Sequence, residues 1–172
     1  FLPEVVLSQD LETVFLEDLT WTEVRDALSV GTTTVIIPTG GTEQNGPHMV
    51  LGKHNYLVQY KAGEVARRLG NTLVAPVMAY VPEGDIDPPS GHMRFPGTIT
   101  TPPEVFEQVL EFAARSLKQH GFLDVALLGD SGGNQSSQAA VAERLNEEWA
   151  VLPVRVHHLT DYYPGPGDAW LV

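Results

Sequence analysis

Four short runs of aliphatic and β-branched residues alternate with helical segments along this chain, and this alternation limits the folds that it can adopt. The runs cover residues 32–37, 73–78, 125–128 and 154–159. Between them, apolar residues recur with helical spacing at 55–69, 102–120 and 136–149. Strands that alternate with helices of this length form β-α-β units with right-handed crossovers. The sequence therefore predicts an α/β fold with a mainly parallel sheet.

The length of the chain, 172 residues, suits a single domain with a real hydrophobic core, and we expect one domain over residues 1–172. Thr20 and Glu23 have the spacing of a capping box, which predicts a short helix through about Leu28. Residues 1–18 show no clear period. We expect them to form an N-terminal arm that lies on the body of the domain or on a neighbouring subunit.

Composition excludes several classes of partner. The net charge of −12 argues against binding to nucleic acid or to an anionic membrane, and no segment is long and apolar enough to span a bilayer. Without cysteine, the chain has no disulfides and no thiolate metal site. We expect a soluble protein. Because the sequence begins with Phe rather than Met, both a cytoplasmic location and export after signal removal remain open.

Polar side chains gather in a turn directly after the first predicted strand. Residues 38–48 read Pro-Thr-Gly-Gly-Thr-Glu-Gln-Asn-Gly-Pro-His and hold a carboxylate, two amides and an imidazole. In open α/β sheets, ligands bind at the carboxyl ends of the strands, so this turn indicates a functional site. A second candidate is the loop at 81–101, which is rich in Pro and Gly, because loops of this length in compact domains tend to be functional.

The turn also carries a family resemblance. Glu43-Gln44-Asn45-Gly46-Pro47-His48 resembles the Glu-Gln-His-Gly-Pro-His signature of the creatininase (creatinine amidohydrolase) family. Residues 92–99, His-Met-Arg-Phe-Pro-Gly-Thr-Ile, also resemble the family, and residues 129–134, Gly-Asp-Ser-Gly-Gly-Asn, are similar to its Asn-Gly-His-Gly-Gly-Asn turn. The three stretches occur in the family's order, and the resemblance runs from about Leu19 to the C-terminus.

The resemblance implies a three-layer α/β sandwich around the parallel sheet. It also implies a hydrolase in which a metal-activated water attacks a small cyclic or linear amide. Creatininase-like proteins form hexameric or similar assemblies, so we expect a homo-oligomer. Their chains continue into a further C-terminal segment that supplies active-site groups, and we expect this chain to lack that segment, through truncation or through completion by another chain.

The resemblance further implies two divalent metals, zinc or manganese, and locates their ligands. Glu43 matches a ligand of the family pattern. Asn45 stands where the pattern has a ligand His, His54 where it has a bridging Asp, and Ser131 where it has the His of the Gly-rich turn, directly after Asp130. We predict Glu43, His54 and Asp130 as metal ligands. A hydrogen-bonded polar cluster without a metal is the alternative.

The predicted catalytic residues are Glu43, His48 and Ser131. Glu43 would act as a ligand or base, and His48 would orient the loop. Ser131 is a candidate nucleophile that would need an adjacent base such as His54 or His48. Substrate contacts are expected from Asn45, His92, Asn134 and Trp170.

Two functions of different classes remain open from the sequence. The first is a metal-dependent hydrolase of a small cyclic or linear amide. The second is a degenerate, non-catalytic family member that binds a small ligand or serves as an assembly subunit, which the replaced ligands at Asn45 and Ser131 favour.

Overall fold

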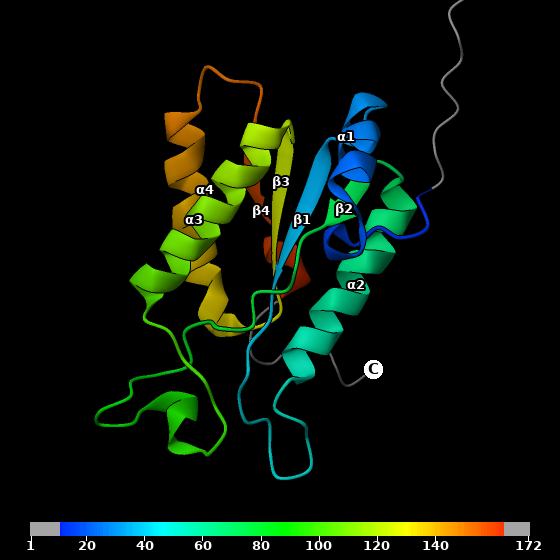
Figure 1. The fold of residues 1–172 in the computed structure, drawn as a ribbon. Helices are drawn as coiled ribbons and strands as arrows, with labels where there is room; N and C mark the ends of the chain where they lie inside the picture. Colours follow the sequence, from blue (N-terminus) through cyan, green and yellow to red (C-terminus); the bar gives the residue numbers. More distant parts are fainter. Residues whose placement is uncertain (1–10, 164–172) are drawn as a thin grey trace, which may run out of the picture.

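A sheet of four parallel strands forms the centre of the fold in the computed structural model, which describes residues 11–163 (Figure 1). The strands run in the order β2-β1-β3-β4 and every neighbouring pair is parallel. Their bounds are Thr34–Thr39 for β1, Thr72–Val74 for β2, Asp124–Gly129 for β3 and Arg155–His158 for β4. The parallel sheet predicted from the alternation of elements is confirmed.

Within residues 11–163, four α-helices and four short 3-10 helices accompany the strands. The α-helices are α1 (Trp21–Ser29), α2 (Lys53–Leu69), α3 (Pro103–His120) and α4 (Gln135–Glu148). The 3-10 helices are η1 (Leu16–Asp18), η2 (Gly91–Arg94), η3 (Gly132–Asn134) and η4 (Thr160–Tyr162). The capping box predicted at the start of α1 is present, with Thr20 and Glu23 each accepting from the other's backbone N–H.

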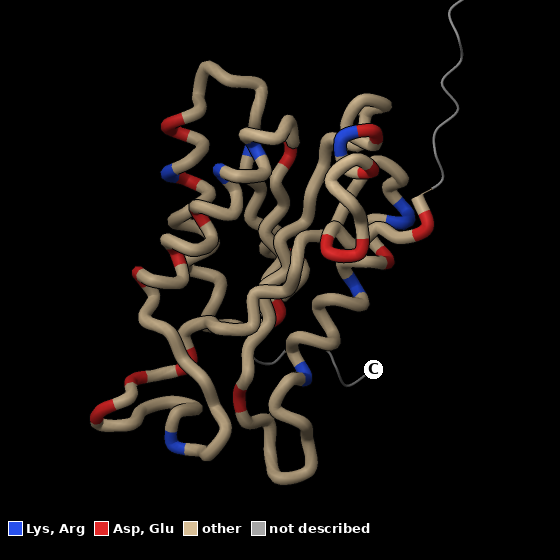
Figure 2. The backbone as a smooth tube through the Cα atoms, in the orientation of Figure 1, with Lys and Arg blue, Asp and Glu red and all other residues tan. Residues whose placement is uncertain are grey.

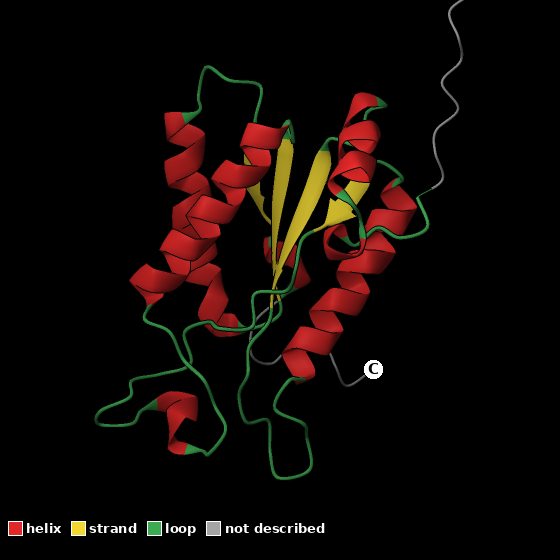
Figure 3. Cartoon of the chain, in the orientation of Figure 1, coloured by secondary structure: helices red, strands yellow, loops and turns green. Residues whose placement is uncertain are grey.

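Side chains that alternate along the strands build two cores. Val35 and Ile37 of β1 pack with residues of α3 and α4 on one face of the sheet, whereas Ile36 packs with residues of α2 on the other. The sheet therefore lies between two helical layers, as Figure 3 also shows. This is the three-layer sandwich that the family resemblance implies.

The second strand is shorter than predicted. The apolar run at 73–78 forms a strand only over Thr72–Val74, and Pro76 interrupts it because proline has no N–H for the ladder. Beyond Pro76, single bridges join Met78 to Thr39 and Val81 to Thr100. As a result, a long loop leaves β2 early and crosses the carboxyl end of the sheet before α3 begins.

The described part of the predicted N-terminal arm packs against the domain's own sheet. The backbone N–H of Val74 donates to Val14 O at 2.8 Å, and Phe15 forms a parallel bridge with Val74. Val14 and Phe15 therefore make a short contact with the β2 edge of the sheet, while residues 1–10 of the arm lie outside the described residues. Among helices within residues 11–163, none has the combined length and apolarity of a membrane span.

The strand order creates a topological switch point between β1 and β3. After β1 the chain turns through α2 to β2 on one side, and after β3 it turns through α4 to β4 on the other side. At such a switch point, the loops that follow the two neighbouring strands leave in opposite directions. Ligands of open α/β sheets usually bind there, at the carboxyl ends of the strands. In Figure 1, the loops after β1 and β2 both extend from this end of the sheet.

Acidic residues are not concentrated at this switch point. Figure 2 shows acidic positions on the helices and on loops at both ends of the sheet, with basic positions among them. The acidic residues within 11–163 are thus not concentrated at one end of the sheet, and the candidate site is identified from its buried side chains.

Candidate functional site

Glu43 lies in the loop after β1, at the switch point of the sheet. Hydrogen bonds from backbone N–H groups hold the loop in place. Gly41 N–H donates to the side-chain Oδ1 of Asn55 at 2.9 Å, and Glu43 N–H donates to Leu51 O at 3.1 Å. Asn134 fixes the end of β1 by donating to Thr39 Oγ1 at 2.9 Å and to Gly40 O at 2.8 Å. These contacts leave the Glu43 side chain pointing inward, and the residue is only 4% exposed.

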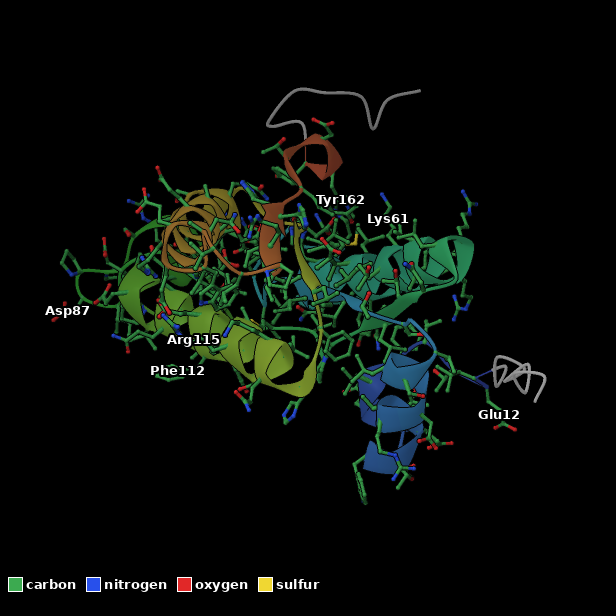
Figure 4. All side chains as sticks on the ribbon, turned by 90° about the horizontal axis from the view of Figure 1, so that it is seen from above. Glu12, Lys61, Asp87, Phe112, Arg115 and Tyr162 are labelled. Atoms are coloured by element: carbon green, nitrogen blue, oxygen red, sulfur yellow. The ribbon has the colours of Figure 1, made fainter. Side chains whose placement is uncertain are left out.

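On the α2 side, a chain of hydrogen bonds connects Glu43 to β3. His54, in the first turn of α2, has Nε2 2.8 Å from Glu43 Oε1 and Nδ1 2.9 Å from Asp130 Oδ2. The hydroxyl of Tyr162 donates to Asp130 Oδ1 at 2.5 Å. Figure 4 shows Tyr162 beside Lys61, whose ammonium lies 5.1 Å from the centre of the tyrosine ring. The four linked side chains run Tyr162–Asp130–His54–Glu43.

On the opposite side, the long loop after β2 supplies two more groups. His92 Nε2 lies 3.3 Å from Glu43 Oε2, and the ligand atoms of Glu43, Glu83 and His92 all lie within 4.8 Å of one another. His92 Nδ1 lies 3.3 Å from Gln44 Nε2, which orients the ring. Glu43 Oε2 and Glu83 Oε1 are buried, and neither has a hydrogen-bond partner unless the two carboxyl groups share a proton. Two facing carboxyl groups of this kind need a shared proton or a cation between them.

Without a cation, this pair of carboxyl groups holds a proton. Burial, together with the hydrogen bond to Glu43, raises the pKa of Glu83 to about 9. Burial also acts to raise the pKa of Glu43, but hydrogen bonds from His54 and Glu83 outweigh it and hold the pKa at about 2. At neutral pH, Glu83 is therefore the protonated partner and Glu43 the carboxylate.

His54 is positively charged in the same arrangement. Burial disfavours the charged ring, yet the hydrogen bonds to Asp130 and Glu43 raise the pKa of His54 to about 9. Burial and the bond to Asp130 raise the pKa of Tyr162, which keeps its phenol protonated. The buried cluster thus balances carboxylates against an imidazolium.

We expect the metal-free protein to lose stability as the pH rises from about 6.5 to about 9. The pKa of His54 rises from 6.5 to about 9 on folding, so its contribution is complete below pH 6.5 and disappears as the pH passes 9. The pKa of Glu83 rises from 4.5 to about 9 on folding, so this residue also makes stability decrease as the pH rises. Urea unfolding across this range, with a chelator present, measures the effect. His54→Gln should make the decrease smaller, with the contribution of Glu83 remaining, and stability that increases with pH would contradict the cluster.

Close approach of Glu83 requires a glycine at position 41. A Cβ on Gly41 would collide with Glu83 Oε1. We expect Gly41→Ala to displace the carboxyl group and to weaken metal binding by ~10-fold or more, in the range of other indirect changes around a metal site. Gly132→Ala is the control, because its Cβ would first meet the Tyr163 ring at 3.4 Å. Equal affinities of the two variants, measured by metal titration, would count against Glu83 as a ligand.

The structure brings four of the sequence-predicted residues together and places the others elsewhere. Glu43, His54, Asp130 and His92 form one cluster. Asn45 lies at its margin, where its Oδ1 accepts from Lys53 Nζ at 2.7 Å. His48 is exposed in the loop after Glu43, and Trp170 lies outside the described residues.

Two residues predicted for chemistry have mainly scaffold contacts. Asn134 is fully buried and its amide group donates to the end of β1. Ser131 is buried beside Asp130, but both nitrogens of His54 face carboxylates, so this ring has no free nitrogen to act as its base. The nucleophilic role of Ser131 and the substrate contact of Asn134 stay predictions, as does the role of His48.

Glu83 was missed by the sequence analysis. It lies in the loop at 81–101 that was singled out as functional, in a stretch that reads Val-Pro-Glu-Gly. The loop contains other acidic residues, Asp85 and Asp87, which are exposed, whereas Glu83 is 5% exposed. The only signal was its place in that loop, because its burial depends on contacts with the distant β1 loop.

Comparison with known proteins settles the family. The profile of creatininase, described as creatinine amidohydrolase, matches residues 17–168. The chain belongs to the creatininase family. This confirms the resemblance that was based on the three sequence stretches.

Curated relatives with sequences similar to this creatininase-family chain have names that describe different activities. A mycofactocin precursor peptide peptidase of Mycolicibacterium smegmatis is 32% identical over 113 residues, which are 63% of this chain and 43% of that protein. A creatinine amidohydrolase of Pseudomonas putida is 28% identical over 117 residues, 68% and 44% of the two chains. A 3-dehydro-scyllo-inosose hydrolase of Thermotoga maritima is 29% identical over 154 residues, 89% and 42%. The matches span less than half the length of each relative.

Solved creatininase structures have the same fold as this chain. A tryptophan-to-alanine mutant of creatininase superimposes with a TM-score of 0.77 at 23% identity, over 92% of this chain and 67% of that one. A creatininase mutant described as the Zn-Zn type gives a TM-score of 0.75 at 24% identity, over 93% and 67%. At these identities the likeness concerns the fold, and the creatininase-like architecture is confirmed.

Proposed function

We propose that this chain is a metal-dependent hydrolase that cleaves the C–N bond of a small cyclic or linear amide. The observation that carries the proposal is the group of Glu43, Glu83 and His92, two buried carboxyl groups and a partly exposed imidazole, with ligand atoms within 4.8 Å of one another. Membership of a family of hydrolases supports the reaction class, and the position of the group at the switch point of the sheet supports a ligand site.

The residues present fit a divalent cation. Two carboxylates and one imidazole are a ligand set that zinc and manganese accept, and the buried oxygens Glu43 Oε2 and Glu83 Oε1 have no hydrogen-bond donor beyond a proton shared between the two carboxyl groups. A cation bound there supplies Lewis-acid polarisation of an amide carbonyl. The chain's own part is to hold the ligands: His54 fixes Glu43, and Gln44 orients His92. Binding displaces the proton that Glu83 holds without a cation.

Half-buried polar groups at the margin of the cluster support a small polar substrate. Lys53 and Asn45 form a bonded pair beside Glu43, and Asn45 Nδ2 also donates to Glu43 O at 3.3 Å. His92, with a side chain 40% exposed, links the buried ligands to solvent. The names of the relatives refer to three classes of substrate: an amide, a peptide and an inosose. Among these classes we propose the amide. It follows the printed family description, creatinine amidohydrolase.

The test is metal content together with a substrate screen. We expect the purified chain, prepared without chelator, to contain zinc or manganese by inductively coupled plasma mass spectrometry and to lose it in Glu43→Ala. The metal-loaded protein should release amine or open the ring in a panel of creatinine, lactams and linear amides. A metal-free protein that also fails to bind added zinc or manganese would overturn the proposal.

A second function, a non-catalytic family member that binds a small ligand or assists assembly, is favoured by one observation. At two positions where the family pattern has ligands, Asn45 is paired with Lys53 and His54 is paired with carboxylates through both nitrogens. The double variant Asn45→His with Ser131→His separates the functions. If metal affinity and turnover appear only in this variant, the natural site is degenerate. We also propose a homo-oligomer, which light scattering after size exclusion would test.

A further inference from the structure

Lys53 places a positive charge at the margin of the candidate site. It is the first residue of α2, and its ammonium donates to Asn45 Oδ1 at 2.7 Å. Asn45 in turn donates from Nδ2 to the backbone oxygen of Glu43 at 3.3 Å. Two hydrogen bonds therefore fix the position of the ammonium relative to the loop that carries Glu43.

This ammonium has no acidic partner. Within residues 11–163, no ion pair joins Lys53 to a carboxylate, although the chain has 22 acidic residues and only 10 Lys and Arg. An ammonium group has three N–H donors, and the bond to Asn45 uses one of them. Because Lys53 is partly exposed, the remaining donors are open to a ligand from solvent. The charge is thus free to pair with an anion.

Helix stability does not explain a lysine at this position. The first turn of a helix is the positive end of its dipole, where acidic side chains stabilise and cations destabilise. The first turn of α2 has no acidic residue, and its N-cap, Gly52, forms no side-chain cap. A side chain that goes against the local preference in this way is typical of a functional position.

We propose that Lys53 determines substrate specificity: its ammonium binds a carboxylate group of the substrate, so the substrate class is a small amide that also carries a carboxylate. The inference rests on the proposed function for the amide, but not for the metal or for turnover. Glu43 is a carboxylate in the same site and repels an anion. The fixed ammonium offsets this repulsion.

Arg94 is the competing candidate for this role. It lies two residues after His92, is exposed, and donates from Nε to Pro89 O at 3.4 Å. This contact holds it to its own loop, whereas Lys53 is bonded to the loop of Glu43. Lys53 is therefore the better placed cation, and Arg94 provides the matched comparison.

Pairs of amides that differ in one carboxylate test the inference. N-acetylglycine is compared with N-acetylglycinamide, and dihydroorotate with dihydrouracil, by isothermal calorimetry on the chain with excess zinc. We expect the acid of each pair to bind ~10-fold or more tightly, because a hydrogen bond to a charged group contributes at least this factor. Equal affinities within each pair, or no binding of any of the four compounds, would overturn the inference.

Three variants assign the preference to a residue. Lys53→Gln removes the charge but keeps a donor for Asn45, so it should make the affinities within each pair equal. Lys53→Arg keeps the charge and should keep the preference, and Arg94→Gln should leave it unchanged. A preference that survives in Lys53→Gln, or that both Lys53 variants lose alike, would overturn the role of the ammonium. If Lys53→Gln does not fold, Arg94→Gln decides, because loss of the preference there assigns it to Arg94.

Hydrolysis of the same four amides separates the inference from the proposed function. Where turnover is found, Lys53→Gln should lower kcat/KM for the two acids by ~10-fold and leave that of the neutral amides unchanged. Turnover without any preference for the acids would overturn the inference and leave the proposed function intact. A preference that depends on Lys53, without turnover or bound zinc, would do the opposite.

Discussion

Replacing Glu83 by glutamine is expected to lower metal affinity by ~100-fold or more, because even residues that only support a metal ligand contribute 10- to 100-fold. Glu83 supplies one of two buried carboxyl oxygens that have no other partner. Amide hydrolysis should fall to background with the metal. Titration with zinc or manganese, followed by turnover at saturating metal, measures both effects.

The same substitution should leave the fold intact. Glutamine has nearly the shape of the protonated Glu83 side chain, whose pKa is raised to about 9 by burial and by Glu43. Its amide can donate to Glu43 where the acid did. Glu104→Gln, at an exposed position in the first turn of α3, is the matched control. Wild-type metal affinity in Glu83→Gln would show that the cation site has been assigned to the wrong residues.

The second large effect is expected on stability. Asp130→Ala removes one of the two carboxylates that compensate the buried His54 ring, and breaking a buried pair in this way costs about 3–5 kcal/mol of unfolding free energy. Tyr162 also loses the acceptor of its hydroxyl. Urea unfolding at pH 7 in the presence of chelator measures the loss without any contribution from metal.

A second histidine–aspartate pair, which joins β3 and β4, provides the control. Asp124 Oδ1, at the start of β3, lies 2.8 Å from His157 Nε2, but both side chains are 47% exposed. Asp124→Ala should therefore cost only about 0–1 kcal/mol, as exposed pairs do. Equal losses in the two variants would mean that the His54–Asp130 contact does not anchor the site.

The sequence by itself determined the secondary-structure elements of this protein and the residues of its polar turn. Alternating apolar runs and helical spacing predicted the strands and helices, since these patterns follow from the backbone geometry of each element. The capping box at Thr20 predicted the start of α1 to the residue. The polar turn at 38–48 and the family resemblance located Glu43, His54 and Asp130, which the structure joins in one cluster.

The tertiary structure decided how these parts combine. The order β2-β1-β3-β4 sets which loops become neighbours, and no local pattern encodes it. Glu83 became a candidate ligand only because the loop after β2 folds back against Gly41, where its carboxyl group is buried and unpaired. Likewise, the place of His54 in the motif predicted a ligand, but only the tertiary structure shows that both of its nitrogens face carboxylates. Burial and pairing arise between residues distant in the sequence, and they fix the charge that each side chain carries.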